Sequence, residues 1–257
     1  MIKLTLGYSS LADRIETMVE PPNHSDWESW LIVQNPDCVD WQGSRSKSIL
    51  ARQDVDLEEL ESKGVAKSRN RAIWLARGEY LVFSDDDVAF DIQGLEQAIR
   101  FLDSQPKYSL LLCQATDEHG VLRKRYPAKV EKLNRFNSAR AATYEMIIRV
   151  DAVRRLGVQF DESFGAGAPN YLGDEYIFIV DLIGAGGKAV FAPITIASHP
   201  TESSGSRWGS RNDRVARARI FTRVFGQLAP LVRLAFGLRR LDELGSVKNL
   251  LLFVLAR

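Results

Sequence analysis

Short apolar runs alternate with helical patterns along the first two hundred residues of the chain. The apolar runs have the length and composition of strands, and they are Ile2–Tyr8, Trp30–Gln34, Tyr80–Phe83, Tyr108–Gln114, Ala189–Ala192 and Thr195–Ala197. Apolar positions at helical spacing predict helices between them, most clearly at Val65–Arg77 and Ile92–Leu102. Thr143–Val150 fits either a strand or a buried helix. Alternating strands and helices indicate an α/β layer built on a largely parallel sheet.

Three adjacent carboxylates follow the most apolar of these strands, Tyr80–Phe83. Residues two apart on a strand share a face, so Asp85 and Asp87 are expected to point one way and Asp86 the other. Ligands of open α/β sheets bind beyond the carboxyl ends of strands, where carboxylate oxygens suit a hard divalent cation. A polar turn leading into a helix capped by Asp91 is the alternative. Because three neighbouring negative charges repel one another, the cluster favours a bound cation.

The helix just before this strand carries polar and basic side chains in its first turns. Lys67, Ser68, Arg69 and Asn70 are donors near the positive end of the helix dipole, where phosphate is favoured. Such residues also form ordinary solvated helix faces. Next to a metal site, they indicate a nucleotide-diphosphate ligand bound between the two elements.

A second block, Phe160–Val180, places two acids directly after a glycine-rich loop. The glycines, which allow close approach to a ligand, are Gly165, Gly167 and Gly173. Asp174 and Glu175 then open a very apolar helix. Acids in a first helical turn complement the helix dipole without any catalytic role. They are also well placed to act as a general base, because loops on a rigid scaffold often carry the chemistry.

One histidine, His199, follows the last predicted strand. An isolated histidine is more often a structural hydrogen-bonding residue than a ligand. Its place just past a strand end keeps a second role open, in which it contacts a metal or a diphosphate.

Charge is distributed unevenly, although the formal net charge is only +1. Residues 201–257 hold eleven Lys and Arg against four Asp and Glu, and the first 200 residues carry a net charge of −6. A basic tail behind an acidic body indicates attraction to an anionic surface such as lipid headgroups, rather than to nucleic acid. The tail also contains an apolar stripe at helical spacing, formed by Leu231, Leu234, Ala235, Leu238 and Leu241. We expect this stripe to pack on the body, with a membrane surface as the alternative.

The chain is expected to be cytoplasmic. Cys38 and Cys113 lie in neither metal-binding nor redox spacing, which is typical of thiols in a reducing compartment. Met1 leads into an apolar strand without the pattern of a signal peptide. The longest apolar run, Leu250–Ala256, is much shorter than the roughly 20 residues of a membrane-spanning helix. Any membrane contact is therefore expected to be peripheral, at the inner face of the membrane.

Two blocks of the sequence together resemble the family-2 glycosyltransferases of the GT-A fold, of the kind that build bacterial polysaccharides. The blocks are GVAKSRNRAIWLARGEYLVFSDDDV and FDESFGAGAPNYLGDEYIF, in the order and spacing of that family. The resemblance covers residues 1–205 and implies a Rossmann-like GT-A domain, with a mostly parallel central sheet flanked by helices. Residues 206–257 are then a basic helical extension, packed on the domain or on a membrane surface.

The resemblance implies an inverting transfer of a sugar from a nucleotide-diphosphate donor to a hydroxyl of a glycan or lipid-linked acceptor, with Mn²⁺ or Mg²⁺ as cofactor. Asp85 and Asp87 match the DxD motif that serves the donor ribose and the metal, and His199 resembles a histidine near that metal. The other donor-binding residues are then Lys67, Arg69, Asn70 and Asp86. The acidic dyad of the family is usually Glu-Asp with the second acid as base, so its register favours Glu175, with Asp174 as the fallback.

The sequence departs from the family pattern at two places. The first strand runs into Tyr8–Arg14 rather than a Pro-x-Tyr/Phe-Asn turn, which leaves the nucleotide of the donor open. Arg207 and Trp208 match the end of the QxxRW motif of processive synthases, but Ser204 replaces the glutamine, so polymerisation is not expected. The competing functions are a sugar-nucleotide pyrophosphorylase, which would need a glycine-rich loop after the first strand, and a non-catalytic membrane-surface binding protein.

Overall fold

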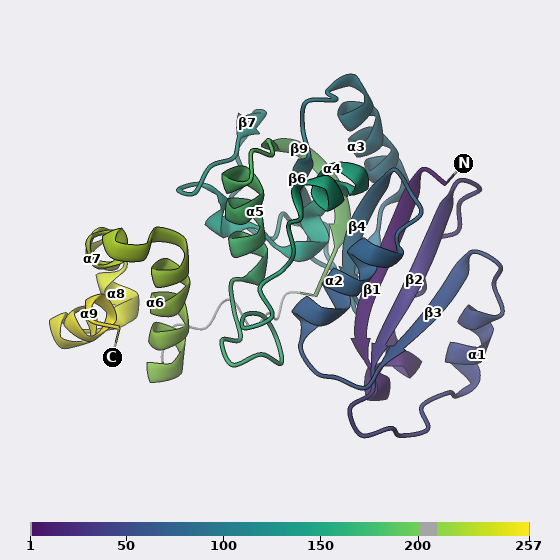
Figure 1. Ribbon diagram of the computed structural model, residues 1–257, viewed down its shortest axis with the longest axis horizontal. Coiled ribbons are helices and arrows are strands. Elements are labelled where there is room, and N and C mark those ends of the chain that lie inside the picture. The colour runs from purple at the N-terminus through teal and green to yellow at the C-terminus, as the bar shows by residue number, and fades with distance from the viewer. Residues whose placement is uncertain (1, 201–209, 257) are drawn as a thin grey trace.

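The computed structural model describes residues 2–200 and 210–256, within which the strands form one mixed sheet (Figure 1). The strands are β1 (Leu4–Leu11), β2 (Trp27–Gln34), β3 (Val55–Leu60), β4 (Tyr80–Asp85), β5 (Ala89–Phe90), β6 (Leu110–Thr116), β7 (Glu131–Lys132), β8 (Met146–Arg149) and β9 (Ala189–Ser198). Their order across the sheet is β3-β2-β1-β4-β8-β6-β9-β5, and β7 pairs with β9. The sheet thus joins segments that lie far apart in the sequence.

The long strands of the sheet all run in the same direction. β1 pairs in parallel with β2 and β4, β2 with β3, and β6 with β9. β8, in the segment that fitted either a strand or a buried helix, is antiparallel to both β4 and β6. The two reversals cancel, so β6 runs the same way as β4, and the carboxyl ends of β1, β4 and β9 meet at one edge. The mostly parallel α/β architecture predicted from the sequence is confirmed.

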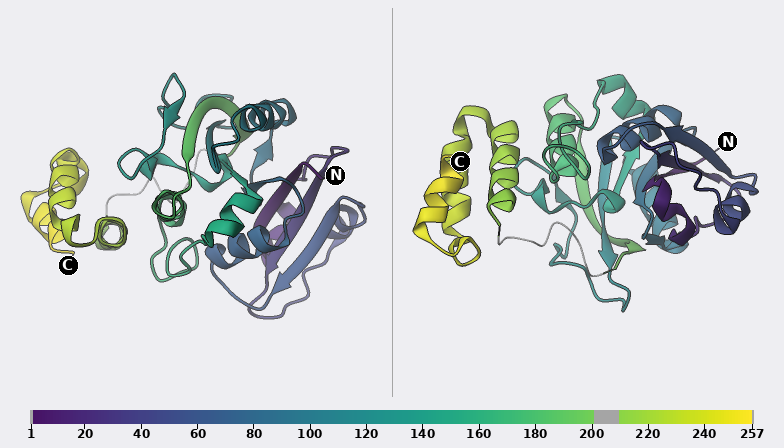
Figure 2. Two further views of the ribbon diagram at one scale, coloured as in Figure 1. Left: turned by 45° about the horizontal axis from the view of Figure 1, so that its top comes forward. Right: turned by 90° about the horizontal axis from the view of Figure 1, so that it is seen from below.

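Helices cover both faces of this sheet (Figures 1 and 2). They are α1 (Ser44–Leu50), α2 (Val65–Leu75), α3 (Ile92–Ser104), α4 (Val150–Leu156), α5 (Asp174–Gly184), α6 (Arg211–Phe225), α7 (Ala229–Leu238), α8 (Leu241–Leu244) and α9 (Val247–Val254). Side chains of α2, α4 and α5 pack on one face, and those of α1 and α3 pack on the other. Helices α6 to α9 lie beyond α5, at the end of the molecule away from β3 and α1 (Figure 1).

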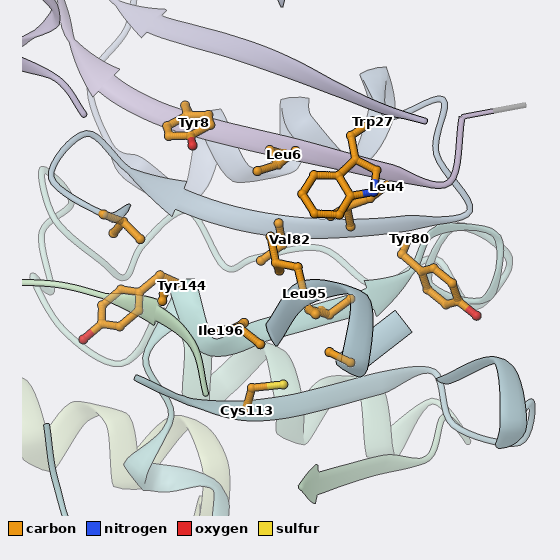
Figure 3. Packing of buried hydrophobic residues seen from close by; sticks show 14 of the residues in the cluster. Leu4, Leu6, Tyr8, Trp27, Tyr80, Val82, Leu95, Cys113, Tyr144 and Ile196 are labelled. Carbon is orange, nitrogen blue, oxygen red and sulfur yellow. The ribbon is translucent and has the colours of Figure 1, made fainter. Parts of the chain in front are cut away.

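Strand β4 lies at the centre of the core, because its side chains alternate between two apolar layers. Leu81 and Phe83 are fully buried in the layer below α2 and α5, where the ring of Phe83 meets that of Phe178 edge to face. Val82 points to the opposite layer and packs with Leu95 of α3 (Figure 3). Burial of each such side chain contributes about 1.5–3 kcal/mol to stability, so both layers hold β4 in place.

Strand β1 is longer than the apolar pattern predicts. The apolar run ends at Tyr8, but the strand continues through Ser9 and Ser10. Both neighbouring strands still pair with it there, since Ser10 lies opposite Val33 of β2 and Ser9 lies opposite Asp85 of β4. Pairing on two sides therefore outweighs the polar character of these residues, and it carries Ser10 to the carboxyl edge of the sheet.

One smaller prediction was wrong in detail. Helix α2 ends at Leu75 instead of Arg77. A Cβ on Gly78 would lie 2.7 Å from the amide nitrogen of Thr5, so the glycine is required by the close approach of this segment to β1.

The C-terminal helices pack against the rest of the molecule mainly through α6. Ile220 joins an apolar cluster that includes Tyr176 of α5. Arg223 forms ion pairs with Asp161 at 2.9 Å and with Asp181 at 2.7 Å. These contacts fix α6 along the outer side of α5.

The apolar stripe of the tail does not pack on the body, so this prediction was wrong. Leu231, Leu234 and Leu238 of α7 are exposed. The buried face of α7 instead contains Ala229, Arg233 and Gly237, and it packs on α9. A Cβ on Gly237 would overlap Leu250, so the glycine lets the two helices approach closely and the larger leucines lie on the outside.

Two features of the sequence analysis fall outside the described residues. They are the boundary expected between residues 205 and 206, and the pair Arg207–Trp208 with Ser204. Among the residues that the structure describes, no helix combines the length and the apolar character needed to cross a bilayer.

The contact between α3 and β9 can be tested at Gly94, in the first turn of α3. A Cβ at this position would overlap the carbonyl oxygen of Thr195, so Gly94→Ala must push the helix away from the strand. We expect the free energy of unfolding, measured by urea denaturation, to fall by about 1–3 kcal/mol. Gly184→Ala, at the end of α5 with no atom within 4 Å of the added carbon, is the matched control. It should be neutral or slightly stabilising, and equal losses in both variants would contradict the close packing.

Candidate active site

A cleft of about 1230 Å³ opens at the edge of the sheet where the carboxyl ends of β1, β4 and β9 meet. Its lining includes residues at or directly after these strand ends, among them Ser10, Asp87 and His199. It also includes Asp174 and Glu175 at the start of α5. The cleft therefore brings together the acid cluster, the acidic dyad and the histidine that the sequence singled out separately.

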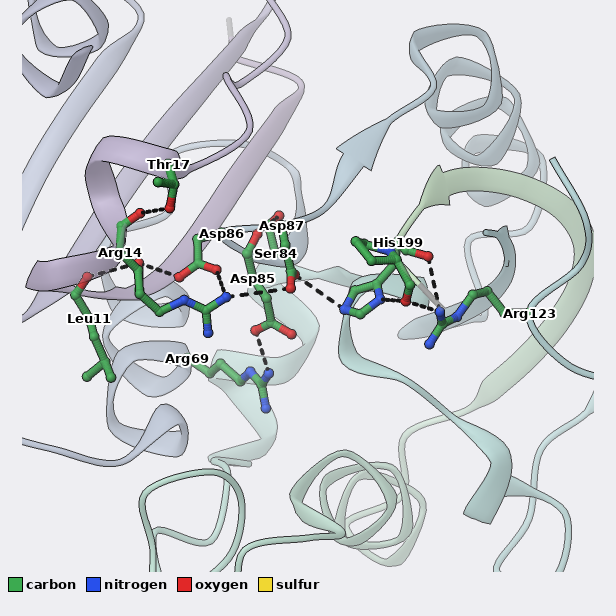
Figure 4. Close-up of polar contacts among 12 residues, drawn as sticks. Leu11, Arg14, Thr17, Arg69, Ser84, Asp85, Asp86, Asp87, Arg123 and His199 are labelled. Atoms are coloured by element: carbon green, nitrogen blue, oxygen red, sulfur yellow. Dashed lines mark hydrogen bonds and ion pairs between the residues drawn. The ribbon is translucent and has the colours of Figure 1, made fainter. Parts of the chain in front are cut away.

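Asp86 is bound by the protein itself. Its buried carboxylate accepts a hydrogen bond from Oγ of Ser10 at 2.5 Å and forms an ion pair at 2.5 Å with Arg14, in the 3₁₀ helix Ala12–Thr17 (Figure 4). Burial raises the pKa of Asp86, and the Ser10 hydrogen bond and the Arg14 charge partly oppose that rise. Each oxygen has a protein partner, so Asp86 fastens the end of β4 to β1, and it also lines the cleft.

Arg69 is the buried cation of the site. Its guanidinium, carried by α2, forms ion pairs with Asp174 at the start of α5 and, at 3.0 Å, with Asp85 at the end of β4. Arg69 and Asp174 are both almost inaccessible to solvent. A planar guanidinium presents several donors in a fixed fork, so it can bind two carboxylates at once. Arg69 thereby sets the position of the dyad relative to the acid cluster.

The two acids of the dyad are in different environments. Asp174 is buried with its carboxylate engaged by Arg69, whereas Glu175 is partly exposed and lines the cleft. Loss of solvent, followed by the negative charge of Asp174, raises the pKa of Glu175, and Arg69 opposes this only in part. A carboxylate whose pKa is raised toward the working pH is well suited to accept a proton. Glu175 thus combines a raised pKa with a position on the cleft, which are the properties that a general base requires.

The glycine-rich loop before the dyad is packed closely on both sides. A Cβ on Gly165 would lie 2.8 Å from the carboxyl carbon of Asp174, so only glycine lets the loop cover this acid. Gly173 has a φ of +89°, and a side chain there would collide with Ile220 of α6. The loop thus fills the space between the dyad and α6.

Polar contacts also tie this loop to α6. The hydroxyl of Tyr171 donates a hydrogen bond to Asp213, and Nη1 of Arg219 donates to the side-chain oxygen of Asn170 at 2.9 Å. The outer side of the loop is therefore bonded to a helix that follows it by about forty residues.

Asp87 and His199 meet at the carboxyl ends of β4 and β9. Nε2 of His199 lies 3.3 Å from Oδ1 of Asp87, and its Nδ1 lies 2.7 Å from the carbonyl oxygen of Pro200 (Figure 4). The imidazole stacks on the ring of Tyr144. Burial lowers the pKa of His199, but Asp87 and the Pro200 carbonyl outweigh this and raise it, while His199 lowers the pKa of Asp87. The two groups thus stabilise each other as an ion pair.

The acid cluster is neutralised by protein cations, which changes the argument made from the sequence. Each acid faces its own partner, in the pairs Asp85–Arg69, Asp86–Arg14 and Asp87–His199. Repulsion among the three carboxylates therefore does not by itself demand a metal ion. Asp91 caps α3, as the alternative interpretation of the cluster predicted.

Two residues expected to bind the donor lie outside the cleft lining. Lys67 is exposed on α2, and the side-chain amide of Asn70 exchanges hydrogen bonds of 2.7 and 3.0 Å with the backbone of Phe160. Lys63 and Gly64, just before the helix, line the cleft instead. The basic helix start contributes Arg69 to the site and uses Asn70 to hold the segment that leads into the glycine-rich loop.

Two cleft residues were not identified from the sequence. Arg14 follows β1, and its position past a strand end at the ligand edge was a usable signal. The guanidinium of Arg123 donates a hydrogen bond to the carbonyl oxygen of His199 at 3.1 Å. That partner lies 76 residues further along the chain, and no local pattern indicates it.

The sequence profile of glycosyl transferase family 2 matches residues 12–155, which is more than half of the chain. The chain belongs to this family. The resemblance noted from the two sequence blocks is thereby confirmed, and the protein is a glycosyltransferase. The matched segment contains Arg69 and the acid cluster, whereas the dyad and His199 lie beyond it. Among curated proteins, no sequence matches this glycosyltransferase.

Solved structures share the fold of this family-2 glycosyltransferase. Residues 1–349 of TarS from S. aureus in complex with UDP align with a TM-score of 0.58 at 14% identity, over 89% of this chain and 68% of that one. The complex with UDP-GlcNAc gives 0.59 at 15%, over 88% and 67%. A longer TarS structure gives 0.59 at 15%, over 96% of this chain, which spans about half (49%) of that one. At these identities the likeness establishes the GT-A fold alone.

Family-2 glycosyltransferases of the GT-A fold are generally associated with a divalent metal, and the cleft residues fit one. Oδ1 of Asp87 is buried and makes no hydrogen bond, since the nearby imidazole approaches without hydrogen-bond geometry. Within the described ranges, no group of three or more His, Cys, Asp and Glu side chains is placed to hold a metal. Asp87 and His199 would then supply two ligands and the donor phosphates others, as in sites where one or two protein groups and the substrate phosphates together hold the ion.

The buried ion pair at the centre of this site can be tested by Arg69→Met. The change leaves Asp174 buried without its cation, and we expect the free energy of unfolding to fall by about 3–5 kcal/mol. Arg71→Met on the same helix is the matched control, because its ion pair with Glu58 is partly exposed. That loss should stay below about 1 kcal/mol in the same urea titration. Similar losses of unfolding free energy in both variants would contradict the conclusion that the buried ion pairs of Arg69 hold the site together.

Proposed function

We propose that the protein transfers a sugar from a nucleotide-diphosphate donor to an acceptor hydroxyl, with inversion at the anomeric carbon. The observation that carries the proposal is the difference between the acids of the dyad. Asp174 is bound to Arg69, whereas Glu175 is open to the cleft. One of the two acids is thus available to take a proton, in the same cleft as Asp87 and His199. A single base beside a diphosphate site is what a direct displacement requires.

In this mechanism Glu175 removes the proton of the acceptor hydroxyl while the hydroxyl oxygen attacks the anomeric carbon. The bond to the donor diphosphate breaks, its electron pair leaves with the nucleoside diphosphate, and the proton stays on Glu175. A placed carboxylate base typically contributes about 10²–10⁴-fold to such a step. Asp87 and His199 would hold a divalent ion, which when bound would supply positive charge beside the donor diphosphate. Asp85 lines the same part of the cleft and is proposed to contact the donor.

The substrates are proposed from the neighbours and from the size of the cleft. TarS is seen with UDP and UDP-GlcNAc, which makes uridine nucleotide sugars the first donors to test. A cleft of about 1230 Å³ exceeds the ~300–1,000 Å³ of most small-molecule sites, so an acceptor fits beside the donor. We infer a glycan or lipid-linked acceptor and a cytoplasmic role in the synthesis of a surface polysaccharide or another glycan.

The competing functions gain no support from the structure. A pyrophosphorylase would need a glycine-rich loop after the first strand, but β1 continues to Leu11 and a 3₁₀ helix without glycine follows it. If the protein only bound a membrane surface, nothing would require Glu175 to face the cleft with a raised pKa.

Glu175→Gln is expected to stop sugar transfer while leaving donor binding intact. The amide keeps the size of the side chain but does not accept the proton, so turnover should fall by about 10²-fold or more. Release of free nucleotide from a panel of nucleotide sugars with Mn²⁺ measures turnover, and the thermal shift with UDP measures binding. Glu162→Gln, the same change on an exposed side chain of the preceding loop, should retain full activity. Full activity of Glu175→Gln would move the base to Asp174.

The pH profile of the wild type gives a second readout of the same base. Because the pKa of Glu175 is raised, a large part of this group is protonated at pH values where an ordinary glutamate is ionised. The rate at saturating donor should therefore rise as pH increases through that raised pKa, and the residual rate of Glu175→Gln should lack this rise. A wild-type profile that is flat from acidic to alkaline pH would contradict the assignment.

Asp87→Asn is expected to abolish metal-dependent turnover and to weaken Mn²⁺-dependent UDP binding by about tenfold or more. The change removes the charge of the carboxylate that lies beside His199 in the cleft. Calorimetric titration of UDP with and without Mn²⁺ measures the effect. Asp86→Asn is the matched control, because its contacts are with Ser10 and Arg14, and its Mn²⁺ dependence should persist even if its stability falls. Wild-type turnover that is unaffected by EDTA would rule out the metal.

A further inference from the structure

The C-terminal helices carry a concentration of exposed apolar side chains. Half of the large apolar side chains that are exposed in the described parts of the chain lie in this segment, and they are Leu228, Leu231, Leu234, Leu238, Val247, Leu251 and Leu255. The other half are spread over residues 39–136. Single exposed apolar residues are normal on protein surfaces, whereas a concentration of them marks an interaction site.

On α7 these residues form one continuous stripe. Leu231, Leu234 and Leu238 follow a spacing of three and four, which places them on a single face of the helix. Their exposed fractions are 67%, 39% and 57%. The face that contains Ala229 and Gly237 is already used for packing on α9. The leucine stripe therefore faces away from the contacts that hold the helices together.

Helix α9 repeats this arrangement. Val247, Leu251 and Leu255 follow a spacing of four and are each more than half exposed. Leu250 and Phe253 on the other side are buried in the cluster shared by the C-terminal helices. Each of the two helices thus has one face that is buried against the other C-terminal helices and one apolar face that is exposed.

The helices that carry the two stripes also carry exposed cations. Residues 229–256 contain four Lys and Arg, of which Arg233 is buried, against two Asp and Glu. Arg239 directly follows the stripe of α7, Lys248 lies next to Val247 at the start of the α9 stripe, and both are exposed. Apolar stripes flanked by exposed cations are typical of helices that lie in the interface of a membrane, with leucines at the acyl boundary and cations at the headgroups.

We propose that α7 and α9 dock the protein on an anionic lipid bilayer. A second copy of the chain is a poorer occupant, because a symmetric contact would place the cations of two identical basic patches against one another. An anionic surface complements both the leucines and the charge. Phe236 and Arg240, from α7 and the turn after it, line the cleft, so docking holds the cleft close to the bilayer. This inference concerns where the enzyme works and stands apart from its reaction.

Flotation of the full chain with lipid vesicles, in the absence of donor and metal, tests the proposal. We expect binding to phosphatidylcholine vesicles that contain about one third phosphatidylglycerol, little binding to phosphatidylcholine alone, and weaker binding at high salt. The combined change Leu231→Ser, Leu238→Ser and Leu251→Ser should lower the bound fraction by about tenfold or more. Phenylalanine at the same three positions should preserve binding.

The matched control changes exposed apolar residues of the body. Val121→Ser with Val130→Ser removes side chains that are 61% and 53% exposed outside the tail, and it should leave vesicle binding unchanged. Thermal unfolding and sugar transfer to a soluble acceptor should be the same in the leucine variant and the wild type, which separates this test from that of the reaction. Undiminished binding of the serine variant overturns the proposal, as does equal binding to neutral vesicles. A lipid-free oligomer that the serine changes dissociate would identify a second copy as the occupant.

Discussion

The buried guanidinium of Arg69 is the constraint on which the site depends. A charge in the protein interior costs several kcal/mol unless it is paired, and Arg69 is paired with Asp85 of one element and Asp174 of another. This requirement holds β4 and α5 in one relative position, although the two partners of the Asp174 contact are 105 residues apart in sequence. The same ion pair engages the carboxylate of Asp174. Its neighbour Glu175 is left poorly solvated and close to a negative charge. The ion pair thus fixes the geometry of the dyad, while burial and the charge of Asp174 raise the pKa of Glu175.

The direction of the strands explains why residues from such distant segments meet. Because antiparallel β8 lies between β4 and β6, β9 runs parallel to β4, and their carboxyl ends share an edge. The first strand ends at the same edge, and its polar extension supplies Ser10. Protein cations from three different elements then balance the acids that collect there. The sheet thus brings these residues to one edge, and the ion pairs hold each acid in its position there.

The parts of the site that were predictable are those with a strong local pattern. Two such patterns are present in the structure. One is an apolar strand followed by acids, and the other is a glycine-rich loop followed by two more acids. The partners were not predictable, because periodicity does not say which distant side chain faces an acid. At 100° per residue Arg69 points about 200° away from Lys67, so the two could not both face the cleft. The stripe of Leu231 and Leu238 shows the same limit, since spacing identifies an apolar face but not what covers it.

The glycine-rich loop has one side against Asp174 and the other against α6, where Tyr171 and Asn170 are hydrogen-bonded. For this reason the C-terminal helices of this chain cannot simply be exchanged for those of another protein. Grafting the helices of a different relative onto this body would strip the loop of its outer support, and the acids behind it would lose their fixed setting. Divergence of the tail and divergence of the loop are thus coupled, and the helices that follow the catalytic region must evolve together with it.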